Sequence, residues 1–200
     1  MKRSIWSDVK TRAAACAASL MVFSCATAMA SGVSSDPGPQ ATDRPAAPTV
    51  NPADVASIES IVAALYDVIS GPAGKKRDWD RMRSLFVPYG RLIPVGRRAN
   101  GEMGNRAMTV DEYIAGSSKF LEDNGFFERE IARRTERFGN IAHIFSTYES
   151  KHKADDPKPF ARGINSIQLM NDGKRWWIVT VFWQGEAADN PLPEKYLSNR

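Results

Sequence analysis

Five side chains have the types and positions expected to line a small-molecule pocket. One falls in an apolar segment with helical spacing, and four fall on the strand face that we assign to the interior. Phenol, amide, hydroxyl and guanidinium groups set among apolar walls are typical of such pockets. The alternative is a filled core in which each polar group bonds to a neighbour. The five residues are Tyr66, Arg133, Tyr148, Asn165 and Thr180.

His143 is the candidate for general acid–base catalysis. If residues 139–140 (Gly-Asn) form a two-residue hairpin turn, His143 lies opposite Glu136 on the outer face of the sheet. A cross-strand pair and a general base oriented by a carboxylate both fit this placement. The predicted registers put no strand carboxylate or histidine into the pocket unless a β-bulge reverses a face. We therefore assign no catalytic residue and favour binding, either of a small, partly apolar ligand or of a protein partner, over the alternative of acid–base catalysis.

The remaining chemistry-bearing motifs are absent from the sequence. No group of Cys, His and Asp has metal-ligand spacing, and both cysteines, Cys16 and Cys25, lie in the first thirty residues. No nucleophile elbow, phosphate-binding loop or dinucleotide fingerprint occurs. We predict neither a metal nor a cofactor.

Residues 1–30 have the pattern of a signal peptide. Four basic residues precede an apolar run over 13–23, which is too short for a stable membrane anchor, and Ala-Met-Ala at 28–30 is a small-x-small cleavage site. We predict cleavage after Ala30 and a periplasmic or secreted protein without a stable membrane anchor. A lipoprotein signal with Cys25 as the lipidated residue and an amphipathic helix of the folded domain are the alternatives.

The charge balance argues against nucleic-acid binding. The whole chain has a formal net charge of +4. The predicted signal contains four basic residues and one acid, so its removal leaves a net charge of about +1. A nearly neutral domain lacks the basic surface that nucleic acids or anionic membranes attract.

The rest of the chain divides into a linker, one domain and a tail. Residues 31–52 are rich in Ser, Pro, Gly and Ala and are predicted to be a disordered linker. Residues 53–186 have the hydrophobic periodicity of a folded domain. Residues 187–200 contain two prolines and form the predicted C-terminal tail.

Three helices are predicted ahead of the long strands. The first is an apolar-faced helix between Val55 and Ile69, the second follows the capping residue Asp78, and the third begins with the capping box Thr109–Glu112. Between the last two, residues 91–95 read as a strand at a sheet edge because of their proline. Residues 96–107 read as a loop, either a pocket rim or a solvated connection.

Four long strands are predicted after the third helix. The first two span about 126–138 and 141–151. The last two flank Asp172-Gly173, for which a tight two-residue turn is the expected connection. Helices followed by an antiparallel meander predict an α+β fold, with the helices on one face of the sheet.

The last hairpin, with the sequence DGKRWWIV at 172–179, resembles that of the nuclear transport factor 2-like superfamily, and FGNIAH at 138–143 is similar to an earlier turn of that group. The resemblance covers residues 53–186. It implies a cone-like curved antiparallel sheet with three N-terminal helices packed on one face. Members include isomerases, dehydratases, polyketide cyclases and binding modules, so the resemblance implies no single reaction. The isomerases resembled have a base carboxylate on the first strand, and residues 91–95 contain no Asp or Glu.

The outer sheet face is predicted to be an interface. In the predicted registers, both faces of the last hairpin are apolar, and helices can cover only one of them. A homodimer is therefore the predicted assembly, because exposed apolar patches of this size are rare on monomers. Such a homodimer also resembles the way in which many members of the superfamily pair. Cover by the C-terminal tail is the alternative. The predicted interface residues are Phe145, Trp177, Val181 and Trp183.

Overall fold

The computed structural model describes residues 49–198. The predicted signal peptide and residues 31–48 of the predicted linker lie outside these residues. No helix in the described part of the chain is long and apolar enough to cross a membrane. The elements, in order, are η1 (Pro52–Val55), α1 (Ile58–Ile69), α2 (Trp79–Leu85), β1 (Phe86–Arg97), β2 (Met103–Asn105), α3 (Val110–Asn124), β3 (Phe127–Phe138), β4 (Ile141–Lys151), β5 (Ala161–Asn171), β6 (Trp176–Gly185) and η2 (Glu194–Tyr196).

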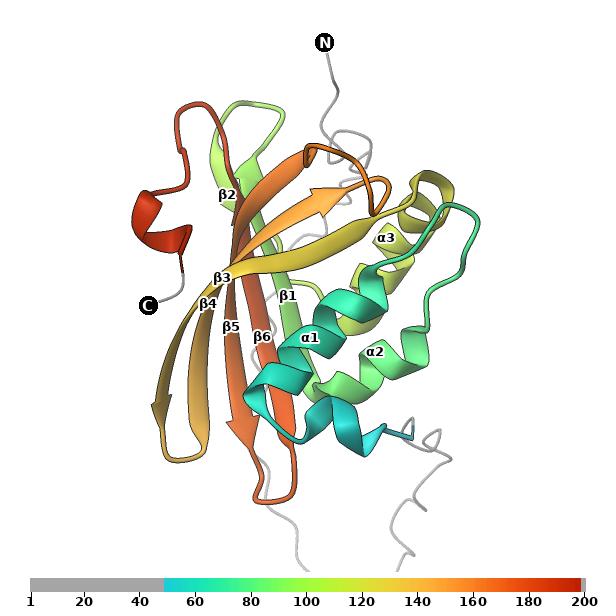
Figure 1. Cartoon of the computed structure of the whole chain (residues 1–200), viewed down its shortest axis with the longest axis vertical. Helices are drawn as coiled ribbons and strands as arrows, with labels where there is room; N and C mark the ends of the chain where they lie inside the picture. The colour runs from blue at the N-terminus through green and yellow to red at the C-terminus, as the bar shows by residue number, and fades with distance from the viewer. Residues whose placement is uncertain (1–48, 199–200) are drawn as a thin grey trace, which may run out of the picture. The chain divides into compact units, whose positions relative to one another are not determined.

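The fold is α+β, as the sequence predicts, with three helices on one side of a curved six-stranded sheet (Figure 1). The strand order is β2-β1-β6-β5-β4-β3. The sheet is mixed rather than wholly antiparallel, because β1 pairs in parallel with β6. This parallel pairing brings the first strand against the last one, so the sheet joins segments that are far apart in the chain.

The predicted edge strand is longer than expected and does not form the edge. β1 runs through both Pro88 and Pro94, and its end at Val95–Arg97 pairs with β2. β2 lies inside residues 96–107, which were predicted to be a loop. The prolines misled the boundary prediction because proline is excluded only where its missing N–H would be needed for pairing.

Helix α1 begins later than the apolar periodicity suggests. Ser57 caps it, and Ser57 and Ser60 form a reciprocal capping box. Val55 belongs instead to the short helix η1, whose first turn is capped by Asn51. The apolar face of α1 packs on the sheet and includes fully buried Ile61. This face orients α1 so that one of its edges borders the cavity described below.

Two hairpins set which side chains face the helices. The β3–β4 register is as predicted from residues 139–140 back to the pair Ala132–Thr147. The β5–β6 prediction is wrong at its turn, because Asp172–Arg175 form a four-residue connection instead of a two-residue turn. A shift of two residues leaves the faces unchanged, since side chains alternate with a period of two.

A β-bulge in β6 does reverse the faces beyond it. Leu169 pairs with Ile178 and Gln168 pairs with Thr180, so Val179 is the extra residue. Val181 is consequently buried in the core, at 5% exposure, and Trp183 packs edge-to-face on Tyr113 of α3. Both had been predicted to lie on the outer face. That part of the predicted interface is wrong.

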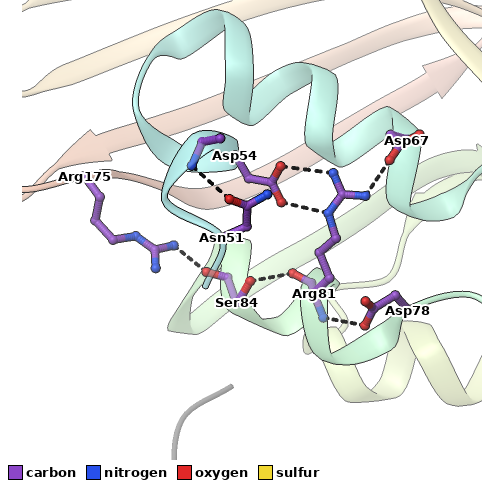
Figure 2. Close-up of polar contacts among 8 residues, drawn as sticks. Asn51, Asp54, Asp67, Asp78, Arg81, Ser84 and Arg175 are labelled. Carbon is purple, nitrogen blue, oxygen red and sulfur yellow. Dashed lines mark hydrogen bonds and ion pairs between the residues drawn. The ribbon is translucent and has the colours of Figure 1, made fainter. Parts of the chain in front are cut away.

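Arg81 of α2 joins η1, α1 and α2 through its guanidinium group. Figure 2 shows the group binding both carboxylate oxygens of Asp54, at 2.7 and 3.1 Å, and reaching Asp67 of α1. The backbone N–H of Arg81 is also bonded to the capping carboxylate of Asp78, at 2.9 Å. Bidentate geometry makes this pairing stronger than an ordinary surface ion pair. It holds α1 at a fixed position relative to α2.

Arg77 holds the connection between α1 and α2 without any carboxylate partner in the described residues. Its side chain is buried, at 7% exposure, and donates to backbone carbonyls of the α1 end and the following turn. Another bond, of 3.0 Å, reaches the carbonyl of Leu121 in α3. Burial lowers the pKa of Arg77, against the opposing effect of the Glu122 carboxylate. The remaining acceptors are the carbonyls of Ile69, Gly71, Pro72 and Lys75.

The C-terminal segment covers part of the outer face, on the opposite side of the sheet from the helices (Figure 1). Tyr196 of η2 packs on Phe145, with ring centroids 5.0 Å apart, and its carbonyl accepts a hydrogen bond of 2.6 Å from Thr147. Trp177 is half-buried beneath the guanidinium of Arg175. Phe182 on the same face stays 42% exposed. The segment therefore covers only part of the apolar surface predicted to pair.

Pairing through this outer face remains a prediction, now carried by Phe145, Trp177 and Phe182. We expect light scattering coupled to size-exclusion chromatography to give a dimer mass for the wild-type protein. Phe182→Glu should give a monomer, because it buries a charge in the interface without touching the core. Tyr89→Glu, at another exposed aromatic residue, is the matched control. A monomer mass for the wild-type protein would contradict the prediction.

Candidate functional site

A cavity of about 580 Å³ lies between α1 and the strands β3 and β4. Its walls include apolar groups from Val62, Ala63 and Phe127. Such a volume suits a small organic molecule. The other lining residues are Tyr66, Asp67, Ser70, Glu128, Arg129, Glu130, Arg133, Glu149, Lys151 and Ala154.

A β-bulge in β3 brings two carboxylates to this cavity. Ala132 pairs with Thr147 and Glu130 pairs with Tyr148, so Ile131 is the extra residue. Without the bulge, Glu130 would lie on the outer face of the sheet. Arg129 instead of Glu128 would then pair with Ser150 of β4. The expectation that the strands contribute no acid to the pocket is therefore wrong.

Glu128 is held at the inner end of the cavity by neutral hydrogen-bond donors. Its Oε2 accepts a bond of 2.9 Å from the hydroxyl of Ser150, and its Oε1 accepts a bond of 3.3 Å from the amide of Asn165. The backbone N–H of Glu128 is bonded to the hydroxyl of Ser70, the residue that follows α1, at 3.0 Å. No ion pair in residues 49–198 involves Glu128, whereas each other lining carboxylate is paired with a cation.

Glu130 ends a chain of hydrogen bonds that begins at Tyr66. Its Oε1 accepts a bond of 2.7 Å from Arg133, and its Oε2 accepts the hydroxyl proton of Ser146. Ser146 has only that one proton, so Tyr66, whose Oη is 2.7 Å from the Ser146 oxygen, donates to it. Asn165 in turn donates to the Tyr66 oxygen, at 3.0 Å. The bond from Ser146 to Glu130 thus sets the direction of the Tyr66 bond, and the amide of Asn165 can only donate.

The protonation of Glu128 differs from that of an ordinary carboxyl group. Burial raises the pKa of Glu128 to about 7, against the opposing effect of the Ser150 and Asn165 hydrogen bonds. Burial, together with the charge of Glu128, also raises the pKa values of Tyr66, Tyr113 and Tyr148. Near neutral pH, Glu128 is therefore half ionised and is surrounded by three neutral phenols.

The structure brings four of the five predicted pocket residues together. Tyr66 and Arg133 line the cavity. Asn165 lies behind it in the hydrogen-bond network, and Tyr148 is buried beside it in the core. Thr180 does not belong to the group, because the bulge in β6 turns it to the outer face with Gln168. Glu128 and Glu130 were missed, since their placement depends on a single extra residue in β3.

His143 lies outside the cavity. It pairs with Glu136 across β3 and β4, as predicted, but its ring nitrogen Nε2 is bonded to the hydroxyl of Ser166 on β5, at 2.9 Å. The ring also packs against Phe145 on the outer face. His143 is thus part of the sheet surface. Among the described residues no group of three or more His, Cys, Asp or Glu could hold a metal ion.

Solved structures provide the comparison for this arrangement. A protein of unknown function with a cystatin-like fold from Nostoc punctiforme PCC 73102 and the Kfla4162 protein from Kribbella flavida each match with a TM-score of 0.50 and 12% identity, over 66% of this chain and 90% of theirs. The protein shares the α+β fold of these two structures, the first of which is described as cystatin-like. A protein described as NTF-2 like, of unknown function, from Silicibacter pomeroyi DSS-3 matches with a TM-score of 0.45 and 16% identity, over 66% of this chain and 94% of its own. No family model matches the sequence, and no curated protein matches it.

Two of the cavity carboxylates of this domain, Glu128 and Glu130, lie on β3. The first strand contributes none, since Arg91, Leu92, Ile93, Pro94 and Val95 include no acid. The site therefore lacks the first-strand base carboxylate of the isomerases that the sequence resembles.

Proposed function

We propose that this protein binds a small, partly apolar molecule in the cavity between α1 and β3–β4, and that Glu128 exchanges a proton with it. The observation that carries the proposal is a cavity-lining carboxylate with neutral donors as its only hydrogen-bond partners in the described residues. The apolar wall would hold the body of the ligand and Glu128 its polar end.

Acid–base chemistry is favoured over passive binding by the energetics of Glu128. Keeping a carboxyl group half protonated near neutral pH costs folding stability, and carboxyl groups with a pKa raised in this way are typical of sites that move protons. A group that titrates near the working pH can both accept and return a proton. The reaction class is therefore proton transfer, and Glu128 is the residue proposed to touch the ligand.

Blocking the cavity tests the binding half of the proposal. Ala63 lines the cavity from the exposed side of α1, so Ala63→Trp should fill the entrance while leaving the core intact. In ligand-observed NMR with a panel of small amines, alcohols, ketones and carboxylates, we expect at least one class to bind the wild-type protein. Ala63→Trp should weaken that binding by about tenfold or more, which corresponds to 1.4 kcal/mol. Lys119→Trp, at an exposed position of α3, is the matched control.

The proton-transfer half is tested on the same samples. The side-chain carboxyl carbon of Glu128, followed by ¹³C NMR, should titrate near neutral pH in the free protein, and a bound fragment should displace that midpoint. A midpoint that no bound fragment displaces would contradict proton exchange. Failure of Ala63→Trp to weaken any fragment would contradict binding in the cavity.

The proposal also includes export and pairing. Export is supported by the basic start, apolar run and small-x-small site of residues 1–30. Pairing is supported by the exposed Phe182 on the outer face. Neither affects the cavity, which opens on the helix side of the sheet.

A further inference from the structure

The hydrogen-bond donors at the inner end of the cavity are already committed to partners in the protein. Ser150 donates to Glu128, Ser146 donates to Glu130, and Tyr66 donates to Ser146. Asn165 spends one amide proton on Tyr66 and the other on Glu128. A ligand that could only accept hydrogen bonds would have to break one of these bonds or meet Glu128 in its protonated form, whose O–H is then the one donor left.

The acceptors at the same end are not used up. Each oxygen of Glu128 accepts one bond in the described residues, although a carboxylate oxygen can accept two. The Tyr66 oxygen accepts from Asn165 and retains a second lone pair. The cavity therefore presents lone pairs to its ligand, and its complement is a group with several N–H or O–H protons.

Charge selects among such groups. Glu130 is paired with Arg133, and Glu149 with Arg129, while Glu128 has no ion pair among residues 49–198. The attraction between opposite charges is strong in a partly buried site and stabilises the ionised form of Glu128. A cationic ligand group would supply the counter-charge that the described residues do not provide for Glu128.

We propose, resting on the proposed function, that the ligand of this cavity is a small amine whose ammonium group pairs with Glu128 while its apolar part lies against Val62, Ala63 and Phe127. The proton exchanged is then the one shared between the ligand nitrogen and the Glu128 carboxylate. At a pH where Glu128 is half protonated, an arriving ammonium displaces that proton to solvent. A free amine takes the proton instead and becomes the ammonium of the pair.

The other groups around Glu128 would not pair with an amine in this way. The three phenols stay neutral across the relevant range because their pKa values are raised. The other charged groups lie in ion pairs, so an amine gains less from them. The titratable and charged groups that face or border Glu128 are Tyr66 and Asp67 of α1, Tyr113 of α3, Arg129, Glu130 and Arg133 of β3, and Tyr148, Glu149 and Lys151 of β4.

A matched set of three probes tests the proposal on the full-length protein: cyclohexylmethylamine, cyclohexylmethanol and cyclohexanecarboxylate. At pH 8 we expect the amine to bind about tenfold more tightly than the alcohol, and the carboxylate to bind more weakly than either. Glu128→Gln should remove the preference for the amine. Glu102→Gln removes an exposed carboxylate outside the cavity lining and should leave the preference unchanged within about twofold.

Calorimetry on the wild-type protein provides a test that needs no variant. Binding of the amine at pH 7, measured in buffers of different ionisation enthalpy, should release about half a proton per ligand. Equal affinity for amine and alcohol, or an equal loss in Glu102→Gln and Glu128→Gln, would overturn the amine assignment. Alcohols or ketones that bind the cavity and displace the Glu128 midpoint, when amines do not, would overturn it while leaving the proposed function intact. Absence of binding by every class would overturn both.

Discussion

Glu128→Gln is expected to stabilise the protein relative to wild type more at pH 8 than at pH 5. The folded-state pKa of Glu128 is raised to about 7 from an ordinary value of 4.5. Between these values the folded protein holds a proton that the unfolded chain has lost, so stability falls as the pH rises through this window. The fall amounts to about 3 kcal/mol once Glu128 is ionised, since each pKa unit corresponds to about 1.4 kcal/mol. The glutamine variant lacks this term.

Urea unfolding of both proteins at the two pH values measures the effect. The difference in unfolding free energy between variant and wild type should grow by about 2–3 kcal/mol from pH 5 to pH 8. Its absolute value at either pH also contains the cost of the new amide, whose N–H₂ meets a donor at Ser150 or Asn165. Only the change with pH reports on ionisation. Glu149→Gln is the control, and a pH-independent difference for Glu128→Gln would contradict the raised pKa.

Arg77→Met is expected to lower the free energy of unfolding by about 3–5 kcal/mol. The guanidinium is buried and bonds to carbonyls of the α1–α2 connection and of Leu121 in α3. Methionine fills a similar volume but donates no hydrogen bond, so several carbonyl groups lose their partner in a region closed to solvent. The loss exceeds that of a surface arginine because water cannot replace the missing donors.

Two further variants separate hydrogen bonding from charge. Arg77→Lys keeps the charge but has fewer donors in a different geometry, so we expect it to recover only part of the lost stability. Lys76→Met removes a charge from the exposed neighbouring residue and should change the unfolding free energy by no more than about 0.5 kcal/mol. Full recovery in Arg77→Lys would show that charge, rather than the fork of donors, stabilises the connection.

The cavity also relates stability to function. Glu128 destabilises the empty protein at neutral pH, and a cation in the cavity would reverse that effect by favouring the ionised form. The amine that binds should therefore raise the stability of the wild-type protein more than that of Glu128→Gln. Glu128 would thus both lower the stability of the free protein and determine its selectivity for a cationic ligand.

The sequence by itself determined the helices, most strand boundaries and the fold class. Asp78 and the Thr109–Glu112 capping box mark helix starts by local hydrogen bonds, which depend on residues only three positions apart. The β3–β4 turn at 139–140 is likewise a local signal. For the same reason Tyr66 and Arg133 could be placed at the cavity: one follows a helical period, and the other lies between the turn and the bulge.

Only the tertiary structure decided which acids face the cavity. Ile131 in β3 and Val179 in β6 are the extra residues of two bulges, and each reverses every side chain beyond it. Isoleucine and valine are both common in regular strands, so neither residue type marks the position of a bulge. A bulge is stabilised by what it allows on both sides of the sheet, here Glu128 against Ser150 and Val181 in the core. Those contacts join residues far apart in the chain, so no local pattern contains them.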